Sequence, residues 1–272
     1  MPLYYYLEEG MEGPLEIEIS DSEGQRVRHY SSEESDFESC LLHNEDPRRP
    51  YEPKYPSVKT GLNKWNWDTR RQGFSCVRDI TLFEGLQGPH VVPGDYTARI
   101  SVGGKTSEAV FSLKSDPRIT ASAAEITEWS GRIDETTDLL ENVLVSLQQL
   151  RKAQGQIRSL MGEFPEDSDL QQSGREALNV MEAWDHQIIQ PLHETYEDED
   201  AWETMLAGQI RYLLEVIDST GAPVTDGAIS RLADLKSDWA TLESLLGEIR
   251  SNHIDPINAW ARENSVPHIN RE

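Results

Sequence analysis

Hydrophobic and polar residues alternate along the first part of the chain. In "LEIEIS", residues 15–20, the aliphatic side chains fall on one face and the glutamates on the other, as in a half-buried strand. "GDYTARISV" alternates in the same way, and "GGK" at 103–105 predicts a tight turn into "EAVFSLK", with Val110 or Phe111 buried. Several short strands of this kind predict an immunoglobulin-like antiparallel β-sandwich over residues 1–117.

One interval of the first part shows no such alternation. Residues 31–57, "SSEESDFESCLLHNEDPRRPYEPKYPS", are rich in proline and glutamate. We interpret them as a long surface loop between two strands.

Beyond Pro117 the apolar residues recur in steps of three and four, which is typical of amphipathic helices. One such stripe runs from Ile126 to Phe164 and predicts a long helix. Pro165 ends it, Asp167 or Ser168 can cap the next helix, and that helix ends or bends near Pro191.

Two more helices follow in the pattern. The acidic stretch "YEDEDAW" is expected to begin the third, whose stripe runs from Trp202 to Ile217. The fourth extends from Leu232 to Trp260, with a bend before Pro256. Four such helices with short connections predict an antiparallel four-helix bundle over residues 118–272. The fold class is therefore α+β, with two domains.

The charge of the chain limits its partners. Its 272 residues include 25 Lys and Arg against 49 Asp and Glu, a formal net charge of −24. The excess lies mainly in residues 118–272, which hold 12 basic and 29 acidic groups. Such a field repels phosphate backbones and anionic lipid headgroups, so we expect no nucleic-acid partner. No apolar run approaches the roughly 20 residues of a membrane helix, so no membrane insertion is expected.

The beginning of the chain, "MPLYYYLEEG", lacks the basic start and apolar centre of a signal peptide. Two expectations about location stay open. Either the protein is cytoplasmic, or the chain begins after a segment that is removed.

The stretch "GLNKWNWDTRRQG" carries Trp65 and Trp67, two residues apart. In a strand both indoles point the same way, while Leu62, Lys64, Asn66 and Asp68 point the other way. The polar character of that second set predicts that the tryptophans face the core. The alternative is a solvent-facing platform on which a sugar stacks against Trp65 and Trp67.

The two cysteines, Cys40 and Cys76, can form one disulfide, but a single disulfide does not indicate a fold that depends on a framework of disulfides. The seven histidines show no metal-binding pattern. Glu182 and His186 share a helix face and His193 follows, yet neither His-Glu-x-x-His nor Glu-x-x-His occurs. We therefore expect no metal site.

Catalytic motifs are also missing from the sequence. Gly-x-Ser-x-Gly and glycine-rich phosphate loops are absent, and Gly103-Gly104 belongs to a hairpin. Nothing singles out two of the 49 acids as a glycosidase pair, and Glu197 to Asp200 is better explained as a solvated helix start. No catalytic residue and no cofactor is expected.

Four blocks of sequence together resemble one known arrangement. "GLNKWNWDTR", "GPHVVPGDYTARISVGGKTSEAVFSLKSDPRI" and the opening and closing segments resemble the region that follows the β-propeller in bacterial BNR-repeat glycosyl hydrolases and sortilin-like proteins. The matching positions are Gly61, Leu62, Asn63, Trp67, Asp68, Pro93, Gly94, Tyr96, Thr97, Ile100, Asp116, Pro117 and Arg118.

The resemblance implies a secreted or envelope protein with a propeller in front, but this chain has no propeller and no Asp-box repeat. We therefore expect a non-catalytic accessory module that docks or positions a protein partner, a β-propeller chain. The alternatives are a subunit of a sialidase-like glycosidase whose active site lies on a missing propeller, and a free-standing carbohydrate-binding module that uses Trp65, Trp67 or the Tyr4–Tyr6 edge.

Overall fold

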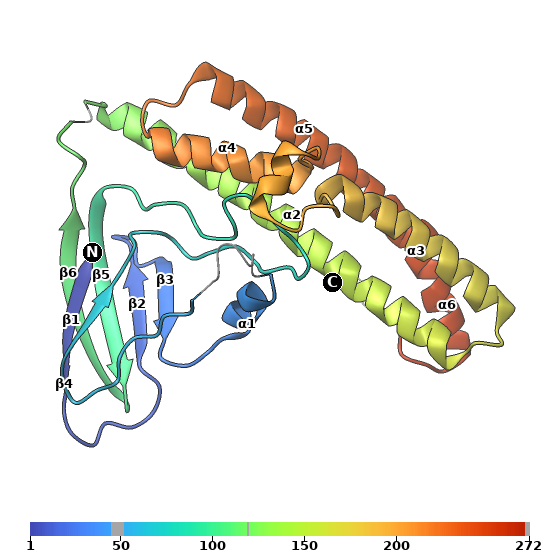
Figure 1. Cartoon of the computed structure of the whole chain (residues 1–272), viewed down its shortest axis with the longest axis horizontal. Coiled ribbons are helices and arrows are strands. Elements are labelled where there is room, and N and C mark those ends of the chain that lie inside the picture. Colours follow the sequence, from blue (N-terminus) through green and yellow to red (C-terminus); the bar gives the residue numbers. More distant parts are fainter. Residues whose placement is uncertain (45–51, 119, 270–272) are drawn as a thin grey trace. The chain divides into compact units, whose positions relative to one another are not determined.

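The computed structural model describes residues 1–44, 52–118 and 120–269. Within them the chain is an α+β protein with two small antiparallel sheets followed by helices, which confirms the predicted fold class at this level (Figure 1). The strands and helices come in the predicted order, with strands in the first part of the chain and long helices after Pro117.

Six strands form the two sheets. Their bounds are β1 Pro2–Leu7, β2 Glu16–Ser20, β3 Arg26–Ser31, β4 Gly61–Asn66, β5 Gly94–Val102 and β6 Lys105–Leu113. One sheet pairs β1 with β4, and the other has the order β3-β2-β5-β6. All pairings are antiparallel.

The predicted hairpin is confirmed. β5 and β6 pair along their whole lengths, from Gly94 opposite Leu113 to Val102 opposite Lys105. Gly103 and Gly104 make the turn with φ values of 56° and 76°, a left-handed conformation that favours glycine. Of the two candidates for burial on β6, Phe111 packs against the core and Val110 is 76% exposed.

Both sheets contribute side chains to one hydrophobic cluster. It includes Tyr5 and Leu7 from β1, Ile17 and Ile19 from β2, and Trp67 directly after β4. These residues occupy alternate positions of their strands, as the period of two requires. The alternation in the sequence therefore decides which face of each strand is buried.

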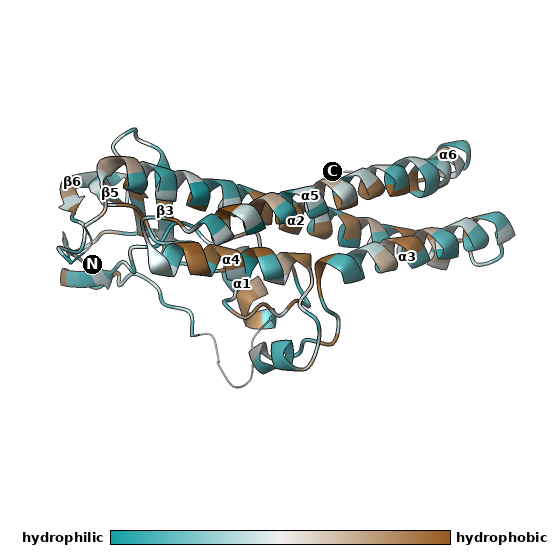
Figure 2. Ribbon diagram, turned by 90° about the horizontal axis from the view of Figure 1, so that it is seen from above, coloured by the Kyte–Doolittle hydropathy of each residue, from teal (hydrophilic) through white to brown (hydrophobic). Residues whose placement is uncertain are grey.

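The helices are α1 Asp36–His43, α2 Ala123–Glu163, α3 Ser168–Ile188, α4 Leu206–Thr220, α5 Asp226–Ile249 and α6 Asp255–Glu263. A 3₁₀ turn, η1 Tyr196–Asp200, precedes α4, and a π-helical turn, η2 Arg250–Ile254, joins α5 to α6. Apolar residues recur between polar ones along α2, α3 and α5 (Figure 2).

The starts and ends of α2 and α3 agree with the pattern. Asp167 caps α3, since its Oδ1 accepts a hydrogen bond from the Leu170 N–H at 2.8 Å. α3 ends at Ile188, ahead of Pro191. At the place where a bend was predicted, before Pro256, the structure has the π-helical turn η2.

Two expectations about the connections were wrong. The predicted loop over 31–57 contains α1, which begins with a capping box between Ser35 and Glu38; residues 45–51 lie outside the described part of the chain. The third helix does not begin in the acidic stretch, because those residues form η1 and α4 starts only at Leu206. Trp202 consequently lies outside the helical stripe and is 48% exposed.

The chain divides into two compact units. The first contains residues 1–79, 84–137 and 214–225, and the second contains 80–83, 138–213 and 226–272. The predicted boundary after residue 117 marks the change from strands to helices. The division into compact units instead falls inside two helices, between residues 137 and 138 of α2 and between residues 213 and 214 of α4.

Candidate functional site

Trp67 lies in the core of the first unit. Its side chain is 1% exposed, and its ring makes edge contacts with Tyr96 and Phe111, at centroid distances of 5.8 and 6.1 Å. The indole Nε1 donates to the Arg70 carbonyl at 2.9 Å, so its one polar group is satisfied. A sugar cannot stack on a buried ring, and this corrects the alternative that placed Trp67 on a carbohydrate platform.

Trp65 points the same way and is partly buried against the same cluster. Its ring meets Tyr30 edge-on at 4.9 Å. The indole Nε1 is covered and has no hydrogen-bond partner among the described residues. Because most of this ring already packs on protein, Trp65 does not supply an open platform either.

The opposite face of the β1–β4 pair is open to solvent. We call the outward-pointing residues of these strands the outer face; they are Pro2, Tyr4, Tyr6, Leu62, Lys64 and Asn66. Tyr4 is 62%, Tyr6 69% and Leu62 74% exposed. An exposed aromatic and aliphatic group on paired strands is the kind of surface that marks a binding site.

The register holds these side chains together. Tyr4 lies opposite Lys64 and Tyr6 opposite Leu62, so each apolar ring has a cross-strand neighbour. The Lys64 ammonium lies 6.0 Å from the centroid of the Tyr4 ring, within the range of a cation–π contact. The sequence pattern predicted that Leu62 and Lys64 point outward and named the Tyr4–Tyr6 edge as a candidate sugar-binding surface, but it did not connect the two strands.

The outer face differs in charge from the rest of the chain. None of its six residues is acidic, although the whole chain carries −24. The nearest acid along β1 is Glu8, just past the strand, and it pairs with Lys105 at 2.6 Å. The hydrogen bond and charge of Lys105 lower the pKa of this glutamate, so it stays ionised and paired.

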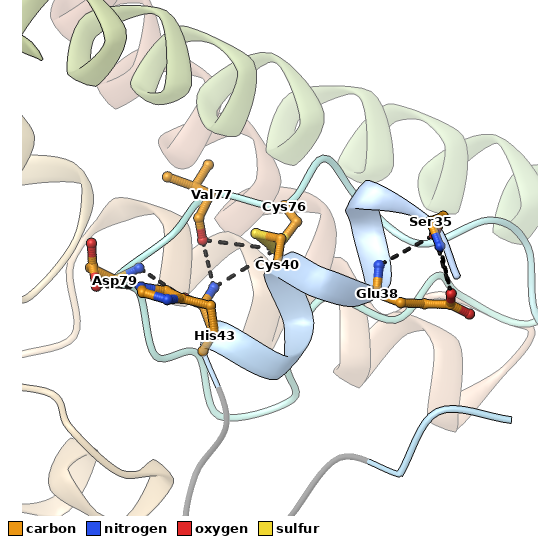
Figure 3. Close-up of a disulfide and its surroundings, with 8 residues drawn as sticks. Ser35, Glu38, Cys40, His43, Cys76, Val77 and Asp79 are labelled. Carbon is orange, nitrogen blue, oxygen red and sulfur yellow. Dashed lines mark hydrogen bonds and ion pairs between the residues drawn. A yellow bond between two sulfur atoms is a disulfide. The ribbon is translucent and has the colours of Figure 1, made fainter. Parts of the chain in front are cut away.

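Cys40 and Cys76 form a disulfide, with sulfur atoms 2.06 Å apart. It joins α1 to the segment after β4, and hydrogen bonds surround it (Figure 3). Asn44 donates its amide to the Val77 carbonyl at 2.5 Å, and His43 pairs with Asp79 at 2.8 Å. A cross-link that closes a loop of 36 residues typically stabilises a fold by about 2–4 kcal/mol. The disulfide and these two contacts hold α1 against the segment of residues 76–79.

The first unit also contains an ion cluster around a buried carboxylate, which no sequence motif predicts. Asp218 has a side chain that is 2% exposed. Its carboxylate accepts hydrogen bonds from the His90 backbone N–H at 3.1 Å and from Arg70 at 3.4 Å, and it contacts His90 Nδ1 at 2.9 Å. A carboxylate that orients a histidine also occurs in catalytic triads. Here the third member is Arg70, which also donates to the Gly88 carbonyl at 2.9 Å. The cluster therefore links the chain around Arg70 and around Gly88 to Asp218 on α4.

The histidines considered for metal binding do not converge. His186 is exposed on α3, whereas His193 is buried and its Nε2 lies 3.4 Å from the Trp202 carbonyl. Within residues 1–44, 52–118 and 120–269, no group of three or more His, Cys, Asp or Glu residues is placed to hold a metal ion. The acidic stretch has a local role, since Asp198 accepts hydrogen bonds from the Glu194 and Thr195 N–H groups at the start of η1.

No protein-family model, curated protein or solved structure matches the chain. In the described residues, no helix is both long enough and apolar enough to cross a membrane.

Proposed function

We propose that this chain is a non-catalytic interaction module that docks a protein partner through the outer face of the β1–β4 pair. The observation that carries the proposal is the open group of Tyr4, Tyr6 and Leu62, each more than 60% exposed, on a strand pair whose other face is anchored in the core. Tyrosine is enriched among the residues that contribute most to protein interfaces. A surface held by paired strands loses little conformational freedom on binding.

A protein partner fits this face better than a sugar does. Leu62 is the most exposed of the three apolar residues, and an aliphatic group offers a sugar neither a flat ring nor a hydrogen bond. Lys64 supplies a positive charge on a face without acids, so the matching surface is apolar with a carboxylate near its edge. The resemblance to post-propeller regions names the partner class, a β-propeller of the BNR-repeat or sortilin-like type.

The proposed architecture is an immunoglobulin-like sandwich followed by a four-helix bundle. The shared hydrophobic cluster of the two sheets supports the sandwich. The three-four spacing of buried residues along α2 supports the bundle; examples are Ile133, Leu140, Val143, Leu147, Leu150 and Ile157. In this arrangement the chain binds its partner through the outer face of β1 and β4.

A binding titration tests the docking function. The purified chain is titrated calorimetrically with a BNR-repeat propeller domain from the same organism. We expect saturable binding that Tyr4→Ser and Leu62→Ser each weaken about 10-fold to 100-fold. Val110→Ser is the matched control, because Val110 is a comparably exposed apolar residue on β6 and lies outside the outer face.

Two other outcomes would replace this function. Binding of the chain to a glycan array that is lost on Tyr4→Ser but kept on Leu62→Ser would support a carbohydrate-binding module. Hydrolysis of aryl sialosides that appears only when the propeller is added would support the alternative of a glycosidase subunit.

A further inference from the structure

The second unit contains a pocket of about 260 Å³ between α3 and the end of α5 with η2. Its floor is apolar and includes Trp184, Leu245 and Ile249, and its rim carries Glu248, Asn252 and His253. Pockets that bind drug-sized ligands measure about 300–1,000 Å³, so this one suits a smaller molecule.

The π-helical turn builds the rim. Pro256 has no N–H, and its ring would clash with a carbonyl one turn earlier in a regular α-helix. The chain avoids the clash by widening the turn, with the Asp255 N–H donating to the Arg250 carbonyl five residues back. The wide turn carries Asn252 and His253, both of which line the pocket. Such turns frequently occur at functional sites.

Trp184, in the floor of the pocket, has its one polar atom satisfied. Trp184 is 1% exposed, and its Nε1 donates to the Leu242 carbonyl at 2.8 Å. Its ring also meets Trp239 edge-on at 6.3 Å. The indole therefore presents only carbon to the pocket, in a fixed position.

The rim, in contrast, has free polar groups. The side chains of Glu248, Asn252 and His253 make no hydrogen bond or ion pair within the described part of the chain. Among the residues that line the pocket, Glu248 is the one acid, and neither Lys nor Arg is present. An apolar floor with a few convergent polar groups is the usual design of a small-molecule site.

The charge of the surroundings selects the ligand. Residues 118–272 hold 29 acidic against 12 basic groups, so this part of the chain repels anions. A positively charged group near Glu248 gains a charge-assisted hydrogen bond, and the two rim residues of η2 offer further hydrogen-bonding groups.

We propose that this pocket binds a small organic cation, with its ammonium group on Glu248 and its apolar body on the accessible side chains of Leu245 and Val180. The site is independent of the outer face, because it lies in the other compact unit. Its failure would leave the docking function intact, and the reverse holds as well.

The test uses the full chain and three probes of similar shape. Phenethylammonium carries the charge, 2-phenylethanol replaces it with a neutral hydroxyl, and 3-phenylpropionate reverses it. Binding is followed by the ¹H–¹⁵N signals of the tryptophan indoles. We expect a saturable shift with phenethylammonium, binding at least 10-fold weaker for the alcohol, and no shift with the propionate.

Variants decide which residues are responsible. Glu248→Gln keeps the side-chain shape and should weaken phenethylammonium binding at least 10-fold, whereas Glu243→Gln, an exposed acid on the same helix outside the pocket, should not change it. Ala183→Leu fills the pocket from α3 and should also abolish the shift. The proposal fails if the amine gives no saturable shift, if Glu248→Gln binds it as tightly as the parent chain, or if the alcohol binds equally well.

Discussion

The two faces of the β1–β4 pair differ in burial and in hydrogen bonding, although the same two strands form both. The inner face carries Tyr5, Asn63 and, just beyond β4, Trp67, all less than 10% exposed and all hydrogen-bonded through their side chains. The outer face carries Tyr4, Tyr6 and Leu62, which are mostly exposed. Aromatic residues occur on both faces, so residue type alone does not distinguish core from binding surface. What distinguishes them is whether the ring packs against the rest of the fold, as Tyr5 and Trp67 do and Tyr4 and Tyr6 do not.

The strongest test of this comparison is Trp67→Ala. The ring fills the centre of the cluster, so its removal should lower the free energy of unfolding by about 3–5 kcal/mol. Urea denaturation followed by circular dichroism measures the loss. A change below about 0.5 kcal/mol, typical of an exposed position, would mean that the two faces are reversed.

The next largest effect is expected for Asn63→Ala. The Asn63 amide donates to the Lys59 carbonyl at 2.7 Å and to the Gly61 carbonyl at 2.9 Å, and it thereby shapes the chain that leads into β4. Loss of both bonds should cost about 1–3 kcal/mol, measured by the same denaturation. Asn66→Ala on the outer face is the control, and an equal cost at both positions would contradict the distinction.

Alkaline unfolding tests the packing of Tyr30, on β3, against Trp65 on the inner face. Burial raises the pKa of Tyr30 from 10.0 to about 12; the charge of Arg28 lowers this pKa by a smaller amount and the charge of Asp68 raises it. Between pH 10 and 12 the folded chain keeps a proton that the unfolded chain releases, so the free energy of unfolding should fall as the pH rises. After allowance for partial exposure the loss is about 1–2 kcal/mol.

Tyr30→Phe should reduce this loss, and Tyr6→Phe on the outer face should leave it unchanged. Burial also raises the pKa of Tyr5 and Tyr96, so part of the alkaline loss persists in the Tyr30 variant. If Tyr30→Phe unfolds with the same pH dependence as the parent chain between pH 10 and 12, the phenol of Tyr30 is in water.

The smallest effect on stability is expected on the outer face itself. Leu62→Ala and Tyr6→Ala should each change the free energy of unfolding by no more than about 0.5 kcal/mol, because these side chains are exposed in the folded chain. Thermal and urea denaturation of both variants measure this. A loss above about 1 kcal/mol would show that the face is covered by another part of the chain and is not free to bind a partner.

Much of the local structure could be predicted from the sequence. The period of two placed Trp65 and Trp67 on the inner face and Leu62 and Lys64 on the outer face, and the glycine pair fixed the β5–β6 hairpin. The three-four stripe and Asp167 located α2 and α3. These features depend on residues close together in the chain, where a repeating pattern carries the information.

Features that depend on distant residues could not be predicted in this way. Asp218 meets His90 across 128 positions, and neither residue stands in a recognisable motif. The pocket on α3 needs the side chains of two helices and a widened turn to come together. α1 was missed for a local reason, since its eight residues are too few to show a helical period amid the prolines and acids around them.

The widened turn at Arg250–Ile254 also determines the orientation of α6. A helix advances about 100° per residue, so an additional residue in one turn rotates everything after it by that angle. With the turn in place, Ile257 and Ala261 are buried and the Trp260 ring meets Phe164 at 5.1 Å. Deletion of one residue from this turn would rotate α6, so that Ile257 and Ala261 leave the interior and Arg262 turns toward it. Because of the additional residue in this turn, α5 and α6 bury helix faces that a single regular α-helix would not align.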